Sequence, residues 1–117
     1  MQFTILANLS VVPLLKRFAI NDFNDKNNFN IYRKKITISL IKELLKEKPV
    51  ICHIDDNYLG DYSHASHFII LERATNKKIL IVDPMKGRKS LISDKKLEES
   101  ILSLKKHIKM CPLLFYL

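Results

Sequence analysis

The sequence predicts an α+β domain, because hydrophobic patterns of helical and of strand type occupy separate stretches of the chain. Apolar residues recur at helical spacing within residues 38–48. Mostly apolar runs of strand length lie within residues 49–54, 67–73 and 78–83. Prolines and polar loops separate these segments, so helices come first and strands follow, with one further helix inserted among the strands.

The first segments are a helix and a loop. Ser10 can cap a helix that runs to about Ile20, because a serine oxygen accepts from backbone N–H groups of the first turn. Pro13 is tolerated in that first turn. Residues 21–30, NDFNDKNNFN, hold five Asn and two Asp, which favour turns over regular structure, so we expect a surface loop.

The next helix carries an apolar face made of Ile38, Ile41, Leu44 and Leu45. Pro49 ends this helix and begins the strand at 49–54. Turn-forming residues around Gly60 then predict a loop.

A β-hairpin follows, with arms at 67–73 and 78–83 that are apolar on both faces, which indicates central strands covered on each side. The sequence MKGR at 85–88 turns the chain. Ser93 or Asp94 caps a helix with one apolar stripe, and residues 112–117 form the last strand. The stripe consists of Leu97, Ile101, Leu104 and Ile108.

Length and composition predict one domain over residues 1–117 with a real hydrophobic core, since 47% of the residues are hydrophobic. The formal net charge is +8. The basic residues are scattered and no aromatic residues interleave with them, which argues against nucleic-acid binding. The apolar opening segment is too short and too interrupted to span a membrane. We expect no cofactor.

The two cysteines, Cys52 and Cys111, both sit in apolar runs. We interpret them as packing residues with free thiols rather than as a disulfide. Free thiols indicate a reducing compartment, so we expect a cytoplasmic protein.

His67 and Asp83 open and close the hairpin, and they are the candidate catalytic residues. If the turn is centred on Thr75, the two residues lie directly opposite each other with their side chains on one face. A carboxylate that accepts from one imidazole nitrogen fixes the tautomer and leaves the other nitrogen as a base. The alternative is a satisfied strand histidine beside an aspartate that shapes the turn before Pro84.

The segments KPVICHID, HFIIL and ILIVDPMKGR resemble the second half of the bacteriocin-processing cysteine peptidases, papain-like domains that cleave after double-glycine leaders. The resemblance covers about residues 36–100. It implies a papain-like fold with N-terminal helices packed on an antiparallel sheet. It also implies a peptide substrate, with His67 as general base and Asp83 as its orienting acid.

The nucleophile of that family does not appear in this sequence. The family's cysteine sits near the N-terminus in a Gln…Cys-Gly context, whereas this chain has no cysteine before Cys52. We expect a domain truncated at its N-terminus. Three hypotheses follow: an inactive relative that binds peptide, an active peptidase completed by a segment outside this chain, or a small basic binding protein unrelated to peptidases.

Two weaker site hypotheses remain. His53, Asp55, His64 and His67 lie close in sequence and have side chains that suit zinc or iron, but their spacing matches no known metal motif. Ordinary loop histidines are the preferred interpretation. Lys86, Arg88 and Lys89 can contact an anion at the turn after Asp83, and the preferred alternative is a solvated basic turn.

Overall fold

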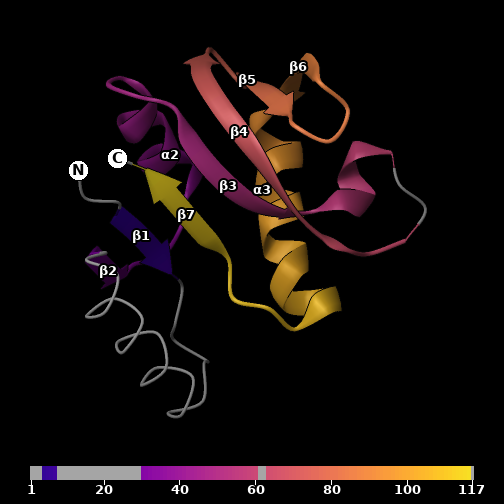
Figure 1. The fold of residues 1–117 in the computed structure, drawn as a ribbon. Coiled ribbons are helices and arrows are strands. Elements are labelled where there is room, and N and C mark those ends of the chain that lie inside the picture. The colour runs from indigo at the N-terminus through magenta and orange to yellow at the C-terminus, as the bar shows by residue number, and fades with distance from the viewer. Residues whose placement is uncertain (1–3, 8–29, 61–62, 117) are drawn as a thin grey trace.

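A computed structural model describes residues 4–7, 30–60 and 63–116, and this part of the chain forms one seven-stranded sheet in the order β2-β1-β7-β3-β4-β5-β6 (Figure 1). The strands are β1 (Thr4–Ala7), β2 (Asn30–Arg33), β3 (Val50–Asp55), β4 (Ser66–Thr75), β5 (Lys78–Asp83), β6 (Arg88–Ser93) and β7 (Leu113–Tyr116). Helices and strands are largely segregated along the chain, so the α+β prediction is confirmed. The predicted helix at 10–20 and most of the loop at 21–30 lie outside the described residues.

The expectation of an antiparallel sheet holds for every neighbouring pair but one. β1 and β2 run parallel, whereas the pairs from β1 through β7, β3, β4 and β5 to β6 are antiparallel. A parallel pair needs a long connection between its strands, and here residues 8–29 supply the connecting length.

Helix α2 (Ile38–Leu45) forms where the sequence predicts it. The Thr37 side chain accepts a hydrogen bond from Leu40 N at 3.1 Å, which satisfies one of the free N–H groups of the first turn. Ile41 and Leu45 are buried, so the predicted apolar stripe faces the core.

Helix α3 (Asp94–Ser103) also begins at its predicted cap, because Ser93 Oγ accepts from Lys96 N at 3.1 Å. A π-helical turn, η2 (Leu104–Ile108), continues it. A π-turn holds one extra residue, which rotates the side chains that follow relative to the helix before it. Lys42 of α2 pairs with Asp94 and ties the two helices together.

Both helices pack against the same face of the sheet, and Figure 1 shows α2 and α3 behind the strands. The core combines their apolar stripes with alternate residues of the central strands. Its members include Ile41, Leu45, Val50, Cys52, Ile54, Ile69, Leu71, Ile79, Ile81, Leu97, Ile101 and Leu114.

The opposite face of the hairpin is only half covered by the described residues. Phe68 of β4 is 39% exposed, and Ile70, Leu80 and Val82 are partly exposed. We expected the hairpin strands to be covered on each side. The helices that the structure describes cover only one face, so the expectation is wrong for the other face.

The sequence reasoning missed β6 because it is an edge strand. Only Ile92 of its six residues is buried, and the others are exposed. An edge strand that presents charged residues to solvent lacks the apolar run that marks a central strand. Within the described residues no helix is long and apolar enough to cross a membrane.

Candidate active site

His67 and Asp83 lie at the same end of the β4–β5 hairpin, and their side chains are in contact. His67 is the second residue of β4 and Asp83 the last of β5. The Nε2 atom of His67 lies 2.9 Å from Oδ1 of Asp83, within the usual range for a hydrogen bond. Only 14% of the His67 side chain and 8% of the Asp83 side chain are exposed. The predicted proximity of the ring and the carboxylate is confirmed.

The strand register that brings them together differs from the prediction. We expected cross-strand pairs centred on Thr75, with His67 directly opposite Asp83. In the structure Thr75 pairs with Lys78 at the turn. Near the other end of the hairpin Ile70 pairs with Val82, and this register brings Asp83 level with Ile69. His67 is therefore a diagonal neighbour of Asp83, still on the same face and still within reach of a long side chain.

A β-bulge at Glu72 produces this arrangement. The register shifts by one residue between Leu71 and Arg73. If the register beyond Arg73 continued without the shift, His67 and Asp83 would lie on opposite faces of the sheet, because side chains alternate with a period of two. The bulge places both on the face that the helices cover.

The environment of Asp83 favours its ionised form. Burial raises the pKa of this carboxyl, but the hydrogen bond from His67, the backbone N–H groups of Met85 and Lys86 and the charge of the ring together lower it below its ordinary value. Met85 N donates to Oδ1 at 2.9 Å. An ionised carboxylate can only accept, so in the neutral form of the His67 ring the proton that is shared with Asp83 belongs to Nε2 and the lone pair to Nδ1.

The two cysteines differ in their burial. Cys52 is fully buried, burial raises the pKa of its thiol, and its Sγ contacts the carbonyl oxygen of His53 at 3.8 Å. Cys111 is half-buried, and both thiols are free. Neither sulfur makes a hydrogen bond with His67, which agrees with their interpretation as packing residues.

A second histidine–carboxylate pair, which the sequence reasoning did not find, lies at the end of β3. Oδ2 of the buried Asp55 lies 2.6 Å from His64 Nδ1 and accepts from Ser103 Oγ at 2.6 Å. Oδ1 accepts from the backbone N–H groups of Asn57 at 3.1 Å and Ala65 at 3.3 Å. Asp55 thus joins β3, the start of β4 and the end of α3.

The electrostatics of Asp55 also favour a carboxylate. Burial raises its pKa, but the hydrogen bonds from Ser103, His64 and Asn57 outweigh burial and lower the pKa below its ordinary value. The His64 ring stacks on the His107 ring with 4.1 Å between centroids and 12° between planes. Asp55 and His64 are close in sequence, but no sequence signal links Asp55 to Ser103, which lies 48 positions away.

His53 is buried on the opposite face of the sheet in an aromatic stack. Its ring lies 4.4 Å from that of Phe68, centroid to centroid, and Phe68 contacts Phe115 edge to face at 5.6 Å. Burial lowers the pKa of His53, partly offset by the backbone of Cys111. The Cys111 backbone is too far or too poorly aligned for a regular hydrogen bond, since neither ring nitrogen has such a partner within the described residues. The lowered pKa favours the neutral ring, and His53 packs as an aromatic side chain.

The structure does not bring the four metal-ligand candidates together. Asp55 binds His64, Asp83 binds His67, and the His53 ring stacks on an aromatic side chain. Among residues 4–7, 30–60 and 63–116, no three His, Cys, Asp or Glu side chains are grouped as metal ligands would be.

The basic turn after Asp83 is exposed. Lys89 forms an ion pair with Glu72 at 3.2 Å, and Arg88 lies opposite Asp83 in the β5–β6 ladder. Lys86, Arg88 and Lys89 are all exposed, as expected of a solvated turn.

Comparison with known families identifies the domain. The family model of the Peptidase C39 family matches residues 15–101. This range contains both histidine–carboxylate pairs but not Ser103, the further partner of Asp55. The chain therefore belongs to the peptidase C39 family. No curated protein and no solved structure matches it.

Proposed function

We propose that His67 is the general base of a cysteine-peptidase site and that Asp83 orients it. The observation that carries this proposal is the 2.9 Å contact through Nε2, which leaves Nδ1 to take a proton from a thiol. A nucleophile, a base and an orienting group are the parts that acyl transfer by a covalent route needs. This chain supplies the second and third of them.

The nucleophile of the reaction lies outside these 117 residues in our proposal. Cys52 would have to leave the core to react, and a thiol whose pKa is raised by burial carries little thiolate. The 117-residue chain alone is then inactive as a peptidase and retains the ability to bind peptide. An active enzyme forms only when another segment brings a cysteine to His67 Nδ1.

The proposed substrates are peptides with a double-glycine leader. The support is the resemblance of the strand, histidine and Asp-Pro segments to the bacteriocin-processing branch, together with family membership. Membership in a peptidase family sets aside the hypothesis of a binding protein unrelated to peptidases.

Incubation of the purified chain with double-glycine leader peptides tests the proposal. We expect binding in a titration and no cleavage, with or without a cysteine alkylator. Alkylator-sensitive cleavage would show that Cys52 or Cys111 acts as the nucleophile and would contradict the proposal. The coding DNA upstream of Met1 separates the two remaining hypotheses, because an in-frame Gln…Cys-Gly stretch there favours the active peptidase.

A further inference from the structure

The segment between β2 and α2 has, at residues 34–36, no backbone pairing with any other described residue. Residues 34–37 belong to no strand or helix. Within the described part of the chain, no backbone hydrogen bond involves Lys34, Lys35 or Ile36, and the carbonyl of Thr37 accepts from Ile41. An extended backbone with free N–H and C=O groups is a template for pairing with another extended chain.

A cavity of about 300 Å³ lies between this segment and helix α3. Ile36 and Ile101, 8% and 4% exposed, are the buried part of its lining. Ile38 and Leu102 add apolar surface, and Leu102 is 56% exposed. The volume is at the lower end for ligand sites and suits a few side chains rather than a large cofactor.

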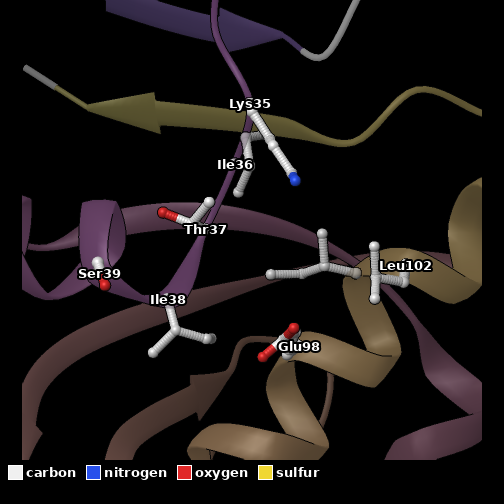
Figure 2. Close-up of a pocket in the computed structure, with 8 residues that line it drawn as sticks. Lys35, Ile36, Thr37, Ile38, Ser39, Glu98 and Leu102 are labelled. Carbon is white, nitrogen blue, oxygen red and sulfur yellow. The ribbon is translucent and has the colours of Figure 1, made fainter.

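Two opposite charges border the cavity without neutralising each other. Figure 2 shows the Lys35 side chain extending from the extended segment toward the space and the Glu98 carboxylate facing it from α3. Both residues are exposed, and the structure contains no ion pair between them within 4.0 Å. A ligand that carries both signs of charge around an apolar group therefore complements this cavity.

We propose that this cavity is a binding site for an extended peptide with an aliphatic side chain flanked by one acidic and one basic residue. The peptide backbone pairs with residues 34–36, the aliphatic side chain fills the cavity, and the flanking charges meet Lys35 and Glu98. Backbone pairing supplies affinity, and a pocket for alternate side chains supplies selectivity. The site contains neither His67 nor Asp83, so the proposal does not depend on the catalytic assignment.

The test uses the whole chain and a capped pentapeptide, acetylated and amidated, with leucine at its centre, glutamate on one side and lysine on the other, in both orders. Backbone amide NMR shifts of residues 34–39 and 98–102 report binding. We expect saturable shifts there. Replacing the central leucine by alanine should weaken binding by roughly tenfold, because most of an aliphatic side chain is no longer buried.

The chain offers a matched pair of variants. Leu102→Asp should weaken binding by roughly tenfold or more, because it puts a charge into the apolar wall. Leu91→Asp should leave binding unchanged, because Leu91 on β6 is equally exposed, at 55%, and does not line the cavity. Circular dichroism checks that both variants fold.

Two further variants keep the test decisive if Leu102→Asp does not fold. Lys35→Glu should weaken binding of the charged peptide more than that of an analogue with both flanking charges removed. His67→Ala should leave binding unchanged, which separates this site from the peptidase site. Absence of saturable shifts at residues 34–39, or equal effects of the two leucine variants, would overturn the proposal.

Discussion

The structure contains two histidine–carboxylate pairs whose histidines, His64 and His67, lie three residues apart, and the two carboxylates differ in how many other groups they bind. Asp55 accepts from Ser103 on α3 and from the backbone at both ends of the following loop, in addition to contacting His64. Asp83 contacts His67 and the turn directly after it. The first carboxylate joins separate elements, whereas the second holds one ring.

The two rings differ correspondingly. His64 is bound through Nδ1 and stacks on His107, and 39% of its side chain is exposed. His67 is bound through Nε2 and only 14% of its side chain is exposed. A histidine and an aspartate in contact therefore do not by themselves define an active site. The distinction comes from whether the carboxylate has other partners to hold and which nitrogen remains available.

Removal of each carboxylate should give the largest difference between the two pairs, measured as a loss in the free energy of unfolding. Asp55→Ala should lower the free energy of unfolding by about 3 kcal/mol or more, because it leaves Ser103 and two backbone N–H groups without their acceptor in a buried place. Asp83→Ala should cost about 1–2 kcal/mol, because fewer groups depend on it. Urea unfolding of both variants measures the two losses. Equal losses would show that Asp83 is a structural hub as well.

The reactivity of the two thiols should differ because Cys52 is buried and Cys111 is half-buried. Cys111 should react with a thiol reagent faster than Cys52 by a factor on the order of 100 or more, because the fully buried Cys52 reacts only after local opening. Mass spectrometry of partly alkylated native protein measures the ratio. Rapid alkylation of Cys52 near neutral pH, abolished by His67→Ala, would make Cys52 the nucleophile and refute the proposed site.

Acid stability reports on both carboxylates. The folded-state pKa of each is lowered, so the stability each contributes is present above the unfolded pKa of about 3.9. It is lost as pH falls from there through the folded value. Asp55→Asn and Asp83→Asn should each make the loss of stability below about pH 4 shallower. Thermal unfolding against pH checks this, and a steeper acid loss in either variant would contradict the assigned shifts.

Replacement of a glycine near each histidine–carboxylate pair should have the smallest effect on the free energy of unfolding. Gly60 lies in the loop after Asp55 with φ of 99°, and Gly87 lies in the turn after Asp83 with φ of 63°. Each should cost about 1 kcal/mol when replaced by alanine, with Gly60 costing more because φ of 99° lies farther from the left-handed helical region that other residues visit. Neither change introduces a clash. Denaturant unfolding of Gly60→Ala and Gly87→Ala measures the order, and a larger cost at Gly87 would reverse it.

Local sequence patterns predicted helix α2, the hairpin arms, the start of α3 and the contact between His67 and Asp83. Each depends on hydrophobic period, on a cap or on a short loop, which neighbouring residues determine. The bulge at Glu72 was not predictable, because the run of apolar residues before it fits either register. The contact between His67 and Asp83 was predicted correctly although the register was wrong. The register error was an even number of residues, which leaves both side chains on the same face.

Contacts between distant segments could not be predicted in the same way. The Asp55–Ser103 hydrogen bond joins the end of β3 to the end of α3, and only the packing of the helix on the sheet brings them together. The β1–β2 pair similarly depends on the long connection between its strands. The family resemblance pointed to His67 and Asp83 but gave no signal for the structural pair at Asp55.

The tautomers of His64 and His67 test whether Asp83 orients His67 as a base. Long-range ¹H–¹⁵N NMR of the chain at neutral pH distinguishes Nδ1–H from Nε2–H for each ring. We expect the Nε2–H form for His67, with Nδ1 unprotonated, and the Nδ1–H form for His64, because His67 contacts its carboxylate through Nε2 and His64 through Nδ1. Asp83→Asn should change the His67 signals and leave those of His64 unchanged. An Nδ1–H tautomer at His67, or His67 signals that do not respond to Asp83→Asn, would contradict the assignment of His67 as a base oriented by Asp83.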